Sequence, residues 1–211
     1  MIAAVKAGDA DAIEAALARE PELAATSENG ISAVRLALYH RQPAALEALL
    51  AAQPPLDGFD LAALGWTKDL HRALAADPEL VDRRSADGFT PLHYAAFFGG
   101  ARAVELLLSE GADPHAVTQD DVQLRPLHSA AAARDAEAAQ LLLEAGADPD
   151  AQQAGGYTAL HAAAQHDDEA LAETLLRHGA DPAVRTDDGA DAAALAEAAN
   201  ATAVEALLGV G

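Results

Sequence analysis

A four-residue phrase, Gly-Ala-Asp-Pro, occurs three times in the second half of the chain, beginning at residues 111, 146 and 179. A second phrase lies about 20 residues before each copy and keeps the same phase: Thr90-Pro91-Leu92-His93, Arg125-Pro126-Leu127-His128 and Thr158-Ala159-Leu160-His161. Two phrases locked at a period of about 33 residues indicate a stack of similar units, none of which can bury its apolar face alone. A single globular core is therefore not expected.

The unit that begins at Asp87 shows the plan most clearly. Gly88 supplies the backbone freedom that a tight turn needs, and Pro91 stands at the start of a helix, where its missing N–H costs nothing. Gly99 marks the end of that helix, and a second helix buries Leu107 before Gly111 stops it. Each unit is therefore predicted to be a turn followed by two short helices.

The two phrases and their spacing resemble those of the ankyrin repeat. The resemblance implies an all-α fold, a single domain over residues 1–211 in which about seven helix-turn-helix units form a right-handed curved solenoid with β-turn fingers. The units are expected at about residues 1–28, 29–57, 58–86, 87–119, 120–154, 155–187 and 188–211. In ankyrin repeats the Thr and His of the opening phrase hydrogen-bond each other, so the resemblance gives His93, His128 and His161 a structural role. Arg125 replaces Thr in one unit and leaves that hydrogen bond in doubt.

The pattern is fainter in the first half of the chain. The turn at Gly30 matches the turn at Gly88 at an offset of 58 residues. Two further segments lack the opening phrase but resemble each other at an offset of 57, which places Gly8 on Gly65. The Pro- and Gly-containing segment Pro54–Gly58 is where the sequence most favours a break in the array, and we interpret it as a loop between repeats.

The composition limits the partners and the compartment. Asp and Glu outnumber Lys and Arg by 34 to 13, giving a formal net charge of −21, and cysteine is absent. Nucleic acids and anionic membranes repel such a surface, so neither is expected as a partner. The first 18 residues lack the basic start of a signal peptide, and no stretch reaches the roughly 20 apolar residues of a membrane span, which favours a cytoplasmic protein. The acidity serves either solubility or attraction to a basic partner.

The resemblance also implies where a partner binds. In ankyrin arrays the turns and the first helices line a concave groove, and the residues there do not hold the stack together. The implied positions are the residue after each turn and the two residues after the Ala-Ala pair of the first helix. They are Ile31, Tyr39, His40, Phe89, Phe97, Phe98, Leu124, Tyr157, Gln165 and His166. Exposed aromatic clusters are typical of interface hot spots, whereas the alternative is that Phe97 or Phe98 is ordinary filling between repeats.

Trp66 is the only tryptophan and stands at the start of a second helix in an irregular unit. It has two interpretations, a partner anchor or a plug in a loosely packed junction near Pro54. The absence of a clear repeat register there favours the packing role.

Catalysis is not expected. The sequence has no Gly-x-Ser-x-Gly elbow, no phosphate-binding lysine loop and no dinucleotide fingerprint after a strand. The run His166-Asp167-Asp168-Glu169 resembles a metal cluster, but acidic residues before a helix also suit the positive N-terminal end of its dipole. We therefore predict no metal, no cofactor and no enzymatic activity.

The sequence favours a cytoplasmic, monomeric ankyrin-repeat adaptor that binds another protein through its groove, centred on Phe89, Phe97 and Phe98. An alternative is an acidic inhibitor or immunity-type protein that caps a basic enzyme or toxin. Strong weakening of binding by salt would support the alternative, and salt indifference would exclude it. An enzyme with an irregular site near Trp66 is a third possibility, but it requires a cluster of perturbed titratable groups that the sequence does not contain.

Overall fold

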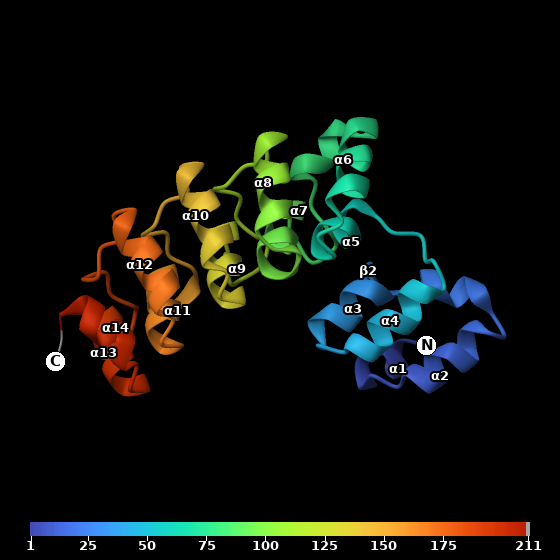
Figure 1. Ribbon diagram of the computed structural model, residues 1–211, viewed down its shortest axis with the longest axis horizontal. Coiled ribbons are helices and arrows are strands. Elements are labelled where there is room, and N and C mark those ends of the chain that lie inside the picture. Colours follow the sequence, from blue (N-terminus) through green and yellow to red (C-terminus); the bar gives the residue numbers. More distant parts are fainter. Residues whose placement is uncertain (210–211) are drawn as a thin grey trace.

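The computed structural model describes residues 1–209, and most of them lie in short helices. Figure 1 shows these helices standing side by side as pairs, in chain order, so that the molecule is elongated with its two ends far apart. The pairs are α1 (Ile2–Ala7) with α2 (Ala10–Leu17), α3 (Ala33–Tyr39) with α4 (Pro43–Ala51), α5 (Gly58–Ala63) with α6 (Thr67–Ala76), α7 (Pro91–Tyr94) and its π-helical continuation η3 (Ala95–Gly99) with α8 (Ala101–Ser109), α9 (Pro126–Ala133) with α10 (Ala136–Glu144), α11 (Ala159–Gln165) with α12 (Glu169–Arg177), and α13 (Ala192–Ala199) with α14 (Thr202–Leu208). The predicted helical solenoid of repeated units is confirmed.

The faint internal resemblance in the first half corresponds to a repeated order of elements. The pair α1 and α2 is followed by the 3-10 helix η1 (Pro21–Ala25), and the pair α5 and α6 by the 3-10 helix η2 (Pro78–Asp82). Gly8 and Gly65 occupy equivalent turns with φ values of 73° and 66°, in the left-handed region that glycine adopts at little cost. The 57-residue offset therefore marks the same local structure twice.

The turns between units form a row of fingers along one edge of the array. The first is a hairpin of β1 (Ser27–Glu28) and β2 (Ile31–Ser32), and the others are tight turns such as the one in which Ser85 N–H donates to the carbonyl of Phe89 over 2.9 Å. Another contains the single helical turn η4 (Ala154–Gly156), whose Ala154 N–H donates to the carbonyl of Val122 in the preceding finger over 2.8 Å. Gln123 takes the left-handed conformation, with φ 57°, at the place where the other turns have glycine.

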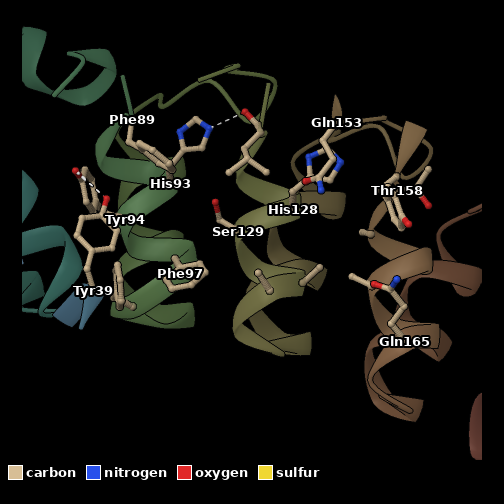
Figure 2. Close-up of a pocket in the computed structure, with 17 residues that line it drawn as sticks. Tyr39, Phe89, His93, Tyr94, Phe97, His128, Ser129, Gln153, Thr158 and Gln165 are labelled. Atoms are coloured by element: carbon tan, nitrogen blue, oxygen red, sulfur yellow. Dashed lines mark hydrogen bonds between the residues drawn. The ribbon is translucent and has the colours of Figure 1, made fainter. Parts of the chain in front are cut away.

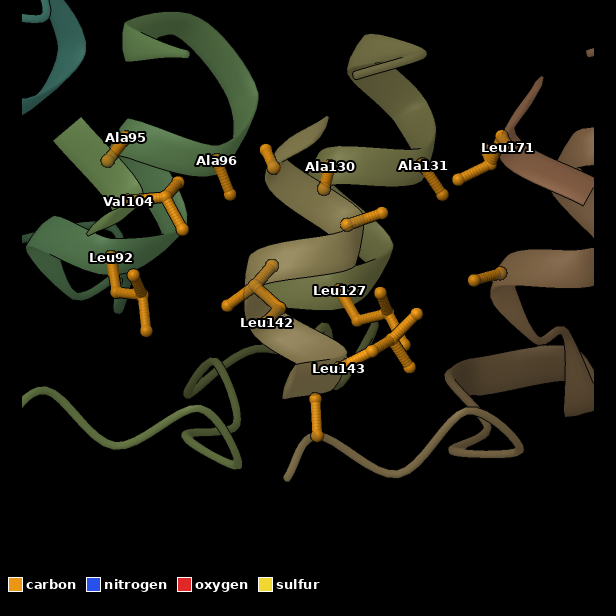
Figure 3. Packing of buried hydrophobic residues seen from close by; sticks show 14 of the residues in the cluster. Leu92, Ala95, Ala96, Val104, Leu127, Ala130, Ala131, Leu142, Leu143 and Leu171 are labelled. Carbon is orange, nitrogen blue, oxygen red and sulfur yellow. The ribbon is translucent and has the colours of Figure 1, made fainter. Parts of the chain in front are cut away.

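The core between the pairs is made largely of alanine and leucine. Figure 3 shows Ala95, Ala96, Ala130 and Ala131 on neighbouring first helices, and all four are at most 1% exposed. Small side chains let helix backbones approach closely, while leucines such as Leu107, which is 0% exposed, fill the space toward the second helices. This explains why the chain needs few aromatic residues for its core.

Most of the buried apolar side chains among residues 1–209 form two clusters rather than one. The first runs from Val5 to Leu49 and the second from Phe59 to Val204, and partly buried Leu56 packs against both. The joint between the two clusters is the segment around Pro54–Gly58, which the sequence analysis interprets as a loop between repeats.

A buried ion pair spans this joint. The Arg35 side chain, which is 2% exposed, donates to Asp60 over 2.9 Å and to Asp57 over 2.8 Å, and its guanidinium lies 5.4 Å from the ring centre of Phe59 and 5.5 Å from that of Tyr94. Burial alone would lower the pKa of Arg35, but the two carboxylates outweigh burial and raise it. The residue is therefore charged, and it joins three successive helix pairs.

Candidate functional site

A groove of about 250 Å³ runs along the first helices in the middle of the array (Figure 2). Its floor comes from α7, η3, α9 and α11, and the fingers before these helices form one side. The lining residues are Tyr39, Phe89, His93, Tyr94, Phe97, Phe98, Leu124, His128, Ser129, Ala131, Ala132, Gln153, Tyr157, Thr158, Ala159, Ala162 and Gln165. Concave sites of this kind, apolar with a few polar groups, are where proteins bind ligands.

Aromatic rings form one end of the groove. The ring centres of Phe97 and Phe98 lie 4.5 Å apart with the rings nearly perpendicular, and Tyr39 meets Phe98 edge-on at 5.4 Å. Phe89 lies 5.7 Å from Tyr94 on the finger side. Such edge-to-face contacts hold large apolar side chains in a fixed arrangement while part of each ring faces the groove.

Three hydroxyl groups around Asp87 fix this end of the groove. Tyr39 donates to Asp87 over 2.7 Å, Tyr94 donates over 2.6 Å, and Ser85 donates as well. Burial raises the pKa of both tyrosines, so they stay protonated and can donate. Partial burial would raise the pKa of Asp87, but these hydrogen bonds outweigh it and hold the pKa below its usual value. Because Tyr39 belongs to α3, this network ties the N-terminal cluster to the groove.

The groove contains two histidines whose ring nitrogens are already engaged. His93 accepts the Thr90 N–H at Nδ1 over 3.3 Å, lies 2.8 Å from the Thr90 hydroxyl, and contacts the carbonyl of Leu124 through Nε2 at 3.1 Å. Burial lowers the pKa of His93 to about 4 and also lowers that of His128. Both rings are therefore neutral at pH 7.

The Thr–His contact that the resemblance implies recurs in the unit of His161, where Nδ1 lies 2.9 Å from the Thr158 hydroxyl. In the unit with Arg125, the main-chain N–H of that residue still donates to His128 Nδ1 over 3.0 Å. Only the hydroxyl contact is missing there, and His128 keeps its place through the main chain.

The depressed pKa of His93 makes stability depend on pH. The ordinary pKa of a histidine is 6.5, so the unfolded chain takes up the proton first as the pH falls, and stability is lost between pH 6.5 and about 4. We expect His93 to reduce the free energy of unfolding by about 2 kcal/mol between pH 7 and pH 5. Urea unfolding at both pH values, followed by circular dichroism, measures this loss. The control is His93→Gln, whose side chain does not titrate. Between pH 7 and pH 5 its free energy of unfolding should fall by about 2 kcal/mol less than that of the wild type. Equal losses in both proteins would contradict the assignment.

The groove carries no ionised side chain, although the protein is strongly acidic. No Asp, Glu, Lys or Arg is among the lining residues in the described part of the chain. Exposed acidic side chains stand instead on second helices, for example Glu105 on α8, Glu137 on α10 and Glu173 on α12. The negative charge thus lies outside the groove lining, on second helices and on fingers such as the one with exposed Asp120 and Asp121.

The structure brings most of the sequence-predicted positions together. The residues in the lining are Tyr39, Phe89, Phe97, Phe98, Leu124, Tyr157 and Gln165. His40 and His166 are exposed and lie outside the lining, and Ile31 packs against the N-terminal cluster. The binding role of all these residues stays a prediction.

The sequence analysis did not place the other lining residues in the groove. Among them are the polar residues Tyr94, Ser129 and Gln153. Tyr94 and Ser129 follow the histidine of the opening phrase directly, so comparing that position between repeats could have found them. Gln153 stands at the base of a finger and has no comparable signal.

Trp66 differs from expectation. Its side chain is 42% exposed, and it belongs to neither apolar cluster of the described residues. The packing role that the sequence favours is therefore wrong, because the turn between α5 and α6 holds the indole at the surface.

The acidic run before α12 consists of helix caps. Asp168 accepts the Leu171 N–H over 3.2 Å at the start of α12, and Asp167 accepts the N–H groups of Ala203 and Val204 in the next unit. Among residues 1–209, no three His, Asp or Glu side chains lie close enough together to hold a metal ion. Over the same residues, no helix has the length and apolar character needed to cross a membrane.

The repeated units match a known family. A family model described as "Ankyrin repeats (3 copies)" matches the chain at residues 1–118, 59–153, 92–187 and 127–211. The chain is an ankyrin-repeat protein. In addition, 75 residues of this ankyrin-repeat chain are 37% identical to a human protein named "DNA-binding protein RFXANK". That match covers 36% of this chain and 29% of the relative. Membership of the family identifies the chain as a protein–protein interaction module.

Proposed function

We propose that this ankyrin-repeat protein is a non-catalytic adaptor that binds a segment of another protein in its groove. The observation that carries the proposal is the gathering of seven sequence-predicted positions around one uncharged groove with an aromatic end. Aromatic side chains that are half-buried and fixed by their neighbours supply contact area at low entropic cost. In this proposal the helix pairs act as seven units of a right-handed curved array, monomeric, cytoplasmic and without a cofactor.

The second candidate function is that of an acidic inhibitor capping a basic enzyme or toxin. The observation that favours it is the acidic surface of the second helices, together with the net charge of −21. The same charge argues against nucleic acid as a partner, although the name of the human relative refers to DNA binding. The two candidates place the partner on different faces of the array.

One experiment separates these candidates. Proteins from the source cells are captured on the wild type, on Phe89/Phe97/Phe98→Glu and on Glu105/Glu137/Glu173→Gln, each at low and moderate salt. The groove proposal expects a protein that only the aromatic variant fails to retain, with little effect of salt, because the lining carries no charge. Loss on the glutamine variant together with strong weakening by salt would favour the acidic inhibitor.

A further inference from the structure

The helix pair α5 and α6 has no finger of its own, and the pairs on either side of it meet directly. Residues 53–57 run into α5 without a turn or hairpin. Gly30, in the hairpin before α3, lies so close to Ala86 in the finger before α7 that a Cβ atom added to Gly30 would be 2.6 Å from the Ala86 side chain. Tyr39 on α3 bonds Asp87 in that same finger over 2.7 Å. The second helix pair therefore contacts the fourth across the unit between them.

The groove would continue onto α5 if the N-terminal helix pairs did not lie there. Leu61 follows the capping box of α5 as Tyr94 follows that of α7, yet Leu61 is 8% exposed and is not part of the lining. Leu64, at the end of α5, packs against the N-terminal cluster. The groove thus ends at Tyr39 and Tyr94, and the N-terminal helix pairs close it there.

Charged side chains, rather than apolar ones, make the buried contact at the joint. The side chains of Arg35 and Asp60 are both 2% exposed, and Arg35 also pairs with Asp57. Desolvation offsets much of the attraction within a buried ion pair, so an intact pair adds little net stability. The apolar contacts across the joint come from partly buried leucines such as Leu38 and Leu56. Separating the two parts would therefore return charges to water and expose little apolar surface.

The other helix pairs are joined differently. From α5 to α14 they share one continuous cluster of buried side chains, largely alanine and leucine, that runs from Phe59 to Val204. Figure 1 shows α1 to α4 as a group set apart from the row that the following helices form. The joint is therefore the place where the array opens with the smallest loss of buried apolar surface.

We propose that residues 1–53, the N-terminal arm, swing as one folded body about residues 54–57, and that the ion pairs of Arg35 are the latch that holds the arm closed over the end of the groove. Opening uncovers α5 and lengthens the groove by one helix pair. It also frees the carboxylates of Asp57 and Asp60, which gives the uncharged groove an acidic end. The inference goes beyond the proposed function, because it concerns a motion of the array whatever binds in the groove.

The distance between two spin labels, measured by double electron–electron resonance on the full chain, tests this motion. The chain has no cysteine, so labels attach only at introduced cysteines. Glu47→Cys on α4 and Glu105→Cys on α8, both at exposed positions, report across the joint. The control pair is Glu105→Cys with Glu173→Cys on α12, which reports within the second cluster. Both pairs are measured with the natural latch, with Arg35→Met and with Arg35→Met/Asp60→Asn, and circular dichroism checks that the helices are kept.

With the natural latch we expect one narrow distance across the joint, that of the closed arm. Arg35→Met leaves the buried Asp60 carboxylate unpaired and should raise the ratio of open to closed arms at least about 100-fold, so that a second, longer distance appears. Adding Asp60→Asn removes the unpaired charge and should restore mostly the short distance. The control pair should keep one distance throughout, with helical circular dichroism unchanged.

Tyr39→Phe is a milder change that decides the question if Arg35→Met fails to fold. It loses the hydrogen bond to Asp87 and leaves the ion pairs of Arg35 in place. The ratio of open to closed arms should rise about 3- to 10-fold, so the longer distance should appear at a lower urea concentration than with the natural latch, before circular dichroism changes. An unchanged short distance in folded Arg35→Met would overturn the inference. Loss of helical circular dichroism in step with the longer distance in Tyr39→Phe would also overturn it, because the arm would then unfold rather than swing.

Discussion

Replacing Arg35 by methionine is expected to lower the free energy of unfolding by about 3–5 kcal/mol, the loss typical of breaking a buried ion pair on one side. The substitution removes both ion pairs across the joint and leaves the buried carboxylate of Asp60 without its cation. Methionine has a similar length, so the apolar contacts of the side chain with Phe59 and Tyr94 are largely kept. Urea unfolding measured by circular dichroism gives the change.

The matched control is the double variant Arg35→Met/Asp60→Asn. Asparagine stays neutral, and its single carbonyl oxygen can accept from the main-chain N–H of Asp57 while its amide N–H donates to the Ser32 hydroxyl, at the two places where the Asp60 oxygens accept. We therefore expect the double variant to recover much of the lost stability. A single variant as stable as the wild type would show that the apolar contact around Leu56, rather than the ion pair, holds the two clusters together.

Leu107→Ala and Phe97→Glu should have opposite effects on stability and binding. Leu107 is 0% exposed between helix pairs, so its truncation should cost about 2–5 kcal/mol of unfolding free energy through lost burial and a cavity. Phe97 is half-buried on the groove, where a carboxylate can reach water, so the glutamate variant should cost less than about 1 kcal/mol.

Thermal unfolding of the two variants beside the wild type checks this contrast, with partner capture as the second reading. Leu107→Ala should melt earlier and bind once folded, whereas Phe97→Glu should melt near the wild type and fail to bind. Comparable destabilisation by both substitutions would show that Phe97 is filling between repeats, the alternative that the sequence leaves open.

The parts of the fold that the sequence predicts are those determined by neighbouring residues. The opening phrases act locally, since Thr158, Pro91 and the histidines cap or begin the helix in which they stand, and their recurrence shows the repeat directly. The groove positions follow from the same register, which is why Phe97 and Tyr157 could be placed before the structure.

The joint between the clusters depends on residues far apart in the chain. Arg35 bonds Asp60 over a separation of 25 residues, and Tyr39 bonds Asp87 over 48. The repeated phrases do not predict these two pairs, because the pairs stand in place of the regular packing between one unit and the next. Ser129 was missed for a different reason. The sequence analysis assigned to the groove only the residue after each turn and the two residues after the Ala-Ala pair, and Ser129 stands at neither position. The exposure of Trp66 depends on a turn whose register the sequence does not reveal.

The central claim is that a partner lies in the groove, and site-specific photo-crosslinking tests it most directly. A benzoylphenylalanine is placed at Gln165, exposed at the end of α11 and part of the lining, or at Glu173, exposed on α12 of the same helix pair. Irradiation of each complex should link the partner to position 165 and not to position 173. Crosslinking from position 173 alone would place the partner on the acidic second helices and contradict the account.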